Sequence, residues 1–118
     1  MPNKLNAHKV TADGETFDSR KEYRRWLELK QLERDGKITA LQRQVSFELL
    51  PKQTRADGKA DRAVTYRADF CYNEVAPDGS YEYVVEDVKG YRGGATYAVF
   101  TIKRKLLLWR YGLTIREI

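Results

Sequence analysis

The sequence predicts a mixed α/β domain whose elements follow the order helix, three strands, helix and strand. An early helix and a late helix are indicated by apolar residues at helical spacing, and the strands between them by apolar residues that alternate with polar ones. The chain has 118 residues, of which 42% are hydrophobic, and this suits one domain with one ordinary core. Apolar segments recur along the whole chain, so its 33% of charged residues does not indicate disorder.

The first helix has clear signals at both ends. Residues 1–16 before it are polar and aperiodic, and we expect a mobile N-terminal segment there. Ser19 and Glu22 have the spacing of a capping box, so the helix is expected to start there and to run to about Asp35, where Gly36 stops it. Its apolar stripe consists of Tyr23, Trp26, Leu27, Leu29 and Leu32.

Three strands are expected next. They lie at 44–50, 64–73 and 81–89. Residues 51–63 are expected to form a basic loop between the first two strands, and a turn at 77–80 makes the second and third strands a hairpin. A glycine-rich segment after the third strand then breaks the sheet.

The second helix is expected to start with a cap at Thr96 and to reach about Arg110, before a short strand at 113–118. Its apolar stripe at helical spacing consists of Val99, Ile102, Leu106 and Trp109. The aromatic residues expected in the core are Trp26, Phe47, Phe70 and Trp109.

The composition narrows the class of protein. The formal net charge of +5 favours an anionic partner such as nucleic acid. The single cysteine, Cys71, excludes an internal disulfide and a zinc site of the Cys/His kind, and we expect it to be a small buried hydrophobe. The single histidine, His8, falls in the polar N-terminal segment. No apolar stretch reaches the roughly 18–20 residues of a membrane span, so we expect no membrane contact and a cytoplasmic protein.

Acidic and basic side chains gather where two strands end. Asp87 and Lys89 point to the same face of the third strand, because side chains alternate along a strand. Asp69 lies on the preceding strand of the hairpin, within reach of a metal ion that it would share with Asp87. The sequence leaves the register open, and a surface ion pair between Asp87 and Lys89 is the alternative interpretation.

These residue types suit the hydrolysis of a phosphodiester. Mg²⁺ takes carboxylate, phosphate and water oxygens as ligands, lowers the pKa of bound water and offsets charge on the phosphate. Lys89 would orient the attacking water or stabilise the charge that develops.

Glu22 has two interpretations that do not exclude each other. In a capping box its carboxylate accepts the Ser19 N–H. It also shares the inward stripe of the helix with Trp26 and Leu29, and a carboxylate on that face needs a partner such as a metal site.

As a set, these segments resemble the PD-(D/E)XK nucleases, and small phage-encoded members most closely. The resemblance rests on Phe17-Asp18-Ser19 with Glu22, Tyr66-Arg67-Ala68-Asp69-Phe70, Val85-Glu86-Asp87-Val88-Lys89-Gly90 and Ile102-Lys103-Arg104-Lys105-Leu106. It covers residues 17–118 as one domain. It implies a restriction-endonuclease-like core of helix, three-stranded meander, helix and strand, in which helices flank a mixed sheet.

The resemblance also implies roles for single residues. Asp69 and Asp87 would be the two acids of the motif, Lys89 its lysine and Glu22 the helix acid. Asp69, Asp87 and Glu22 would hold Mg²⁺, for which Mn²⁺ could substitute. Ala68 replaces the proline that gives the motif its name, and many members lack that proline. Glu86 should point to the other face, where it would pack or form a salt bridge.

The implied function is that of a metal-dependent DNA endonuclease, foremost a phage Holliday junction resolvase that acts on branched DNA as a homodimer in the host cytoplasm. A nuclease for flap, single-stranded or duplex DNA remains an alternative, as does a non-catalytic DNA-binding module with the same fold. The side chains expected to contact DNA are Arg20, Lys21, Arg24, Arg25, Tyr91, Arg92, Lys103, Arg104 and Lys105.

Overall fold

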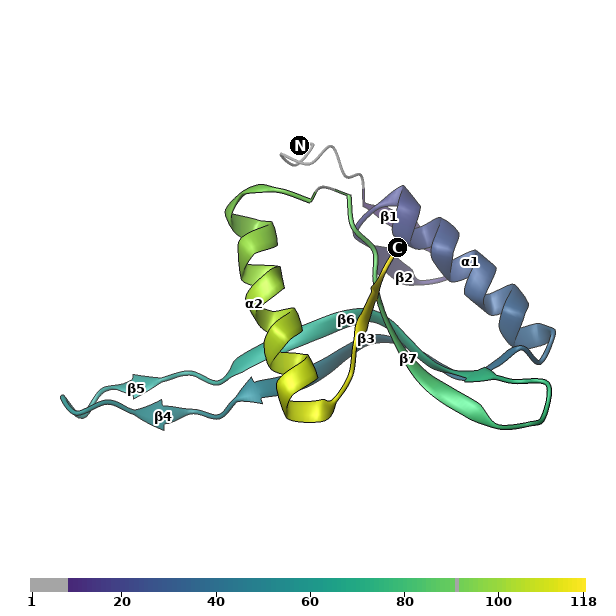
Figure 1. The fold of residues 1–118 in the computed structure, drawn as a ribbon. Coiled ribbons are helices and arrows are strands. Elements are labelled where there is room, and N and C mark those ends of the chain that lie inside the picture. The colour runs from purple at the N-terminus through teal and green to yellow at the C-terminus, as the bar shows by residue number, and fades with distance from the viewer. Residues whose placement is uncertain (1–8, 91) are drawn as a thin grey trace.

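The computed structural model describes residues 9–90 and 92–118, which form a four-stranded mixed sheet flanked by two helices (Figure 1). The elements are β1 Val10–Ala12, β2 Glu15–Phe17, α1 Arg20–Arg34, β3 Ile38–Leu50, β4 Gln53–Thr54, β5 Ala60–Asp61, β6 Val64–Val75, β7 Tyr81–Asp87, α2 Gly94–Tyr111 and β8 Ile115–Glu117. No helix among these residues is long and apolar enough to cross a membrane.

The main sheet has the strand order β3-β6-β7-β8. β3, β6 and β7 pair antiparallel as a meander, and β8 returns parallel to β7. The predicted order of elements is therefore confirmed, and so is the hairpin between the second and third predicted strands. Its register pairs Phe70 with Glu86, which sets Asp69 close to the end of β7.

Two apolar clusters hold the helices against the sheet. α1 packs with Leu29 on a cluster that includes Phe70 and Tyr72, and α2 packs with Phe100 and Leu107 on the other. On β6, even-numbered residues face the α2 cluster up to Ala68, whereas Phe70 and Tyr72 belong to the α1 cluster. The even-numbered side chains of β6 therefore switch at Asp69 from the face of the sheet that α2 covers to the face that α1 covers.

The N-terminal region departs from the prediction. Residues 10–17 form the hairpin β1–β2, although the sequence predicted a mobile segment without regular structure up to residue 16. Strands of three residues are too short to show alternation. Arg43 ties the hairpin to the sheet, because its guanidinium donates to the Thr16 carbonyl at 3.0 Å and meets the Glu15 carboxylate at 3.4 Å. Residues 1–8, with His8, lie outside the described residues.

The expected basic loop at 51–63 is instead a ribbon. β3 is longer than predicted, and beyond it β4 and β5 pair antiparallel with Gln53 opposite Asp61. Figure 1 shows this ribbon extending away from the sheet and both helices.

The apolar stripe predicted for α2 was wrong at Val99, Ile102 and Trp109, whereas Leu106 does pack against the core. The helix starts at Gly94, after Gly93 as its cap, rather than at Thr96. Ile102 is 60% exposed and Trp109 is 76% exposed, while Phe100 and Leu107 are buried. The helix carries apolar side chains on two faces, so spacing alone could not decide which face meets the sheet. Trp26, Phe47 and Phe70 do pack against the clusters, as expected.

Candidate active site

Glu22 is buried in the first turn of α1 and both of its carboxylate oxygens are hydrogen-bonded. Ser19 caps the helix, because its hydroxyl accepts the Glu22 N–H at 3.1 Å. The reciprocal bond of the expected capping box differs: the carboxylate accepts the Asp18 N–H at 3.1 Å, not that of Ser19. Its other oxygen accepts from Gln44 at 3.1 Å and Arg43 at 3.4 Å. Burial raises the pKa of Glu22, and the hydrogen bonds from the Asp18 N–H and from Arg43 oppose the rise.

Asp69 lies in the middle of β6, where its carboxylate accepts the Val88 N–H at 2.7 Å. Burial raises the pKa of Asp69 to about 7, and the negative charges of Asp87 and Glu22 add to the rise. Among residues 9–90 and 92–118, no Lys or Arg side chain lies within ion-pair distance of this carboxylate. Within these residues the ionised form of Asp69 therefore lacks an ion-pair partner of its own, while Lys89 pairs with the neighbouring Asp87.

Asp87 is buried at the end of β7 and has a partner on each oxygen. The Lys89 ammonium lies 3.0 Å from one oxygen, which agrees with the prediction that both side chains share a face. The Tyr66 hydroxyl donates to the other at 2.6 Å. Burial and the Asp87 charge raise the pKa of Tyr66, so it stays protonated as a donor. The Lys89 ammonium also lies 3.3 Å from the centre of the Phe100 ring, a cation–π contact.

The segment that carries Asp87 and Lys89 is fixed by the last strand. Ile118 donates its N–H to the Asp87 carbonyl at 2.9 Å and accepts the Lys89 N–H at 3.1 Å. The Lys21 ammonium bridges the carbonyls of Lys89 and Ile118 at 2.8 and 2.9 Å. Lys21, which was expected to contact DNA, therefore already has protein partners, and it holds the main chain of Lys89 beside that of Ile118.

Four predicted side chains are thus linked by charge: the pKa of Asp69 on β6 responds to the negative charges of Glu22 on α1 and Asp87 on β7, and Lys89 pairs with Asp87. In the described ranges, no three His, Cys, Asp or Glu side chains form a ready-made metal site. Mg²⁺ is commonly bound through one or two carboxylates together with water and phosphate, so Asp69 and Asp87 suffice as protein ligands. Glu22 accepts from three protein groups, whereas Asp87 has two partners and Asp69 has one, so Asp69 and Asp87 keep more oxygen lone pairs for a metal ion. The two-carboxylate set therefore fits the geometry better than the expected three-carboxylate set.

Glu86 points to the opposite face, as predicted, and is completely buried. Arg25 donates to both of its oxygens, at 2.9 and 2.6 Å, and the Tyr72 hydroxyl is a further donor. This ion pair corrects the expectation that Arg25 contacts DNA, because its guanidinium is committed to a buried carboxylate. The pKa of Arg25 is raised, first by this hydrogen bonding.

The other side chains expected at DNA have mixed surroundings. Arg20, Arg24 and Lys105 are exposed, while Lys103 is half-buried. Arg92 and Arg104 lie 3.5 and 3.6 Å from the Glu117 carboxylate. Tyr91 lies outside the described residues.

Sequence reasoning missed three residues that hold the acids in place: Arg43, Gln44 and Tyr66. Tyr66 looks like a core aromatic on an alternating strand, and Arg43 lies just before the strand predicted at 44–50, although β3 includes it. Gln44 has a φ of +53°, a left-handed conformation that is uncommon outside glycine and that no sequence pattern marks.

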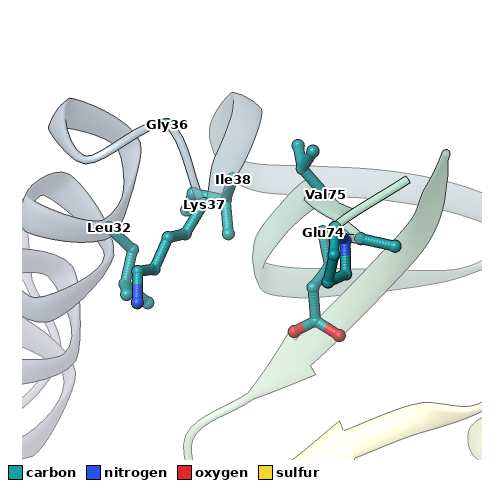
Figure 2. A pocket seen from close by; sticks show the side chains of 8 residues that line it. Leu32, Gly36, Lys37, Ile38, Glu74 and Val75 are labelled. Carbon is teal, nitrogen blue, oxygen red and sulfur yellow. The ribbon is translucent and has the colours of Figure 1, made fainter. Parts of the chain in front are cut away.

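A shallow hollow lies at the opposite end of α1 (Figure 2). Among its lining residues, the ionisable ones are Lys37 and Glu74, and Glu74 is paired with Arg116 at 3.1 Å. Its remaining walls are apolar or main chain, so it offers no group for hydrolysis.

Comparison with known proteins gives one match. The family model described as "Protein of unknown function (DUF1064)" matches residues 2–116. No curated protein and no solved structure matches the chain.

Proposed function

Because the chain belongs to the DUF1064 family, a family of unknown function, we propose its function from the site: a metal-dependent endonuclease that hydrolyses phosphodiester bonds in DNA. The order of helix, antiparallel meander, helix and parallel strand supports a restriction-endonuclease-like core and a place among the PD-(D/E)XK nucleases. The resemblance of the Asp69 and Asp87–Lys89 segments to that motif supports the same assignment.

One observation carries the proposal: within the described residues, Asp69 is a partly buried acid without an ion-pair partner, beside the Asp87–Lys89 pair. Burial and two neighbouring acids raise the pKa of Asp69 to about 7, so its negative charge is costly in the folded protein. A divalent cation beside it would offset that cost. The donors present are carboxylate oxygens, the type that Mg²⁺ and Mn²⁺ prefer. Asp69 and Asp87 would hold the ion, which would supply a more acidic water and offset phosphate charge.

The remaining residues prepare this site. Tyr66 fixes the orientation of Asp87, while Arg43 and Gln44 fix that of Glu22. Phe100 and Asp87 hold the Lys89 ammonium beside the acids, where it would stabilise negative charge that develops on the scissile phosphate. Glu22 acts through its negative charge on Asp69 and through water, rather than as a direct ligand.

The favoured substrate is branched DNA, in the manner of a phage Holliday junction resolvase in the host cytoplasm. Resolution needs two symmetric cuts, and each chain offers one such site, so we propose a homodimer with twofold symmetry. The exposed apolar face of α2, which includes Val99, Ile102 and Trp109, supports it, because such faces mark interaction surfaces. Ile102→Glu with Trp109→Glu should yield monomers in sedimentation, whereas Tyr81→Glu, at an exposed aromatic residue of β7, should not.

A cleavage assay tests the function. Labelled junction, flap, duplex and single-stranded DNAs are incubated with Mg²⁺, with Mn²⁺ and with EDTA. We expect junction cleavage with either metal and none in EDTA. Preference for a flap, single strand or duplex would change the substrate, and binding without cleavage under every metal condition would identify a binding module instead.

A further inference from the structure

The ribbon of residues 51–63, here called the β4–β5 arm, contributes nothing to the core. Every residue from 51 to 62 is exposed. Figure 1 shows the arm projecting past α2, away from the sheet. A two-stranded ribbon is marginally stable by itself, so the arm adds little to the stability of the fold.

The arm is nevertheless ordered at its tip. Arg55 donates its N–H to the Lys59 carbonyl at 2.8 Å and accepts the Gly58 N–H at 2.9 Å. The Asp57 carboxylate accepts the Lys59 N–H at 3.0 Å, and Gly58 supplies the left-handed φ of +84° that the turn needs. The basic side chains of the arm are therefore presented on a defined ribbon.

The charges of the arm are unbalanced. Arg55 is the partner of both acids, Asp57 at 3.8 Å and Asp61 at 3.5 Å. Within the part of the chain that the structure describes, Lys52, Lys59 and Arg62 have no acidic partner. The arm thus offers three unpaired cations to an anionic partner.

The arm continues the strand that carries Asp69. At about 3.3 Å per residue, the base of the arm at residue 63 lies roughly 20 Å from Asp69 and the tip at residue 58 roughly 35 Å away. Along B-DNA, at about 3.4 Å per base pair, these distances correspond to roughly 6 to 10 base pairs. A duplex that leaves the active site along the direction of β6 would therefore pass the arm.

We propose that the β4–β5 arm is a second DNA contact, which binds backbone phosphates of the duplex roughly 6 to 10 base pairs from the scissile bond. The inference rests on the proposed function, because that function supplies the nucleic-acid partner. Lys52, Lys59 and Arg62 form the contact and read no sequence, since contacts to phosphate position a protein without specifying bases. The arm thus sets how much duplex the enzyme needs beside the cleavage site.

The test compares two variants that lose equal charge. Lys52, Lys59 and Arg62 are replaced by Gln in the arm variant, and Lys30, Arg34 and Lys37, at the far end of α1, are replaced by Gln in the control. Binding in EDTA is measured on junctions whose arms have about 5 or about 15 base pairs, lengths on either side of the predicted contact. Circular dichroism and melting check that both variants fold.

We expect the wild type to bind the long-armed junction at least tenfold more tightly than the short one. The arm variant should lose this advantage, and its salt slope should fall by about 3 because three phosphate contacts are gone. Its cleavage of the short junction with Mg²⁺ should be unchanged. The control should keep both the advantage and the slope.

Two results overturn the inference while the nuclease proposal stands. One is an arm variant that keeps the length advantage and salt slope of the wild type, and the other is a control that loses them equally. A wild type that neither binds nor cleaves any of these DNAs refutes the proposed function itself, and the arm inference falls with it.

Discussion

Replacing Asp69 with Asn tests whether this carboxylate is a buried charge without a cation. In the folded protein the pKa of Asp69 is about 7, whereas an ordinary Asp has a pKa of 3.8. Asp69 therefore keeps its proton to a higher pH when the protein is folded. The native state therefore binds the proton more tightly than the unfolded state. In EDTA, the stabilisation from Asp69 is complete below the unfolded pKa and is lost as the pH rises through the folded pKa.

The pKa sets an upper limit for the effect. Each pKa unit corresponds to about 1.4 kcal/mol, so the wild type loses at most about 4 kcal/mol through Asp69 between about pH 4 and pH 8. Asn still accepts the Val88 N–H but carries no charge. Asp69→Asn should therefore match the wild type near pH 4 and exceed its stability near pH 8. Mg²⁺ should then stabilise the wild type and leave the variant nearly unchanged.

Urea unfolding, followed by circular dichroism across this pH range with EDTA or Mg²⁺, measures the free energies of unfolding of the wild type and the variant. Asp78→Asn is the control, because Asp78 also accepts a main-chain N–H, that of Ser80, but is exposed and has a lowered pKa. If the stabilities of the wild type and Asp69→Asn change in parallel with pH, the pKa of Asp69 is not raised by folding, and this carboxylate has no need of a cation.

Three further substitutions probe the site and its support. Asp87→Asn should abolish single-turnover cleavage while junction binding in EDTA holds or tightens, because repulsion of the phosphates falls; near-normal cleavage by the folded variant would remove the nuclease assignment. Tyr66→Phe removes one hydrogen bond to Asp87 and should lower stability by about 1–3 kcal/mol in urea unfolding and slow cleavage, with unchanged rates contradicting a positioning role. Arg25→Ala should destabilise the fold by about 3–5 kcal/mol, because it strands the buried Glu86 charge, and DNA affinity measured under native conditions should not change.

Much of the fold could be predicted because its signals are local. Ser19 and Gly36 bound α1, and alternation marks the strands that become β6 and β7. Which face of α2 packs on the sheet depends instead on contacts with residues that are distant in sequence. Apolar residues occupy two faces of that helix, so the choice of Phe100 and Leu107 over Ile102 and Trp109 depends on the sheet beneath them.

The acids of the candidate site could be named from the sequence, but most of their partners could not. Asp87 and Lys89 are two residues apart at the end of β7, so their ion pair follows from the alternation of an extended chain. The bond from Tyr66 to Asp87 joins two strands whose register the sequence left open. The contacts of Arg43 and Gln44 with Glu22 depend on how β3 passes the start of α1. No pattern within one segment encodes such contacts.

The left-handed backbone at Gln44 sets backbone strain against a side-chain contact at one position. Glycine adopts this conformation without the cost of about 1 kcal/mol that a side chain brings, so Gln44→Gly would relieve the strain. Glycine would also remove the amide that donates to the buried Glu22 carboxylate, and a buried acceptor that loses a donor costs about 1–3 kcal/mol. A search for heat-resistant variants would therefore keep Gln44, and the strained backbone would persist as the cost of an oriented Glu22.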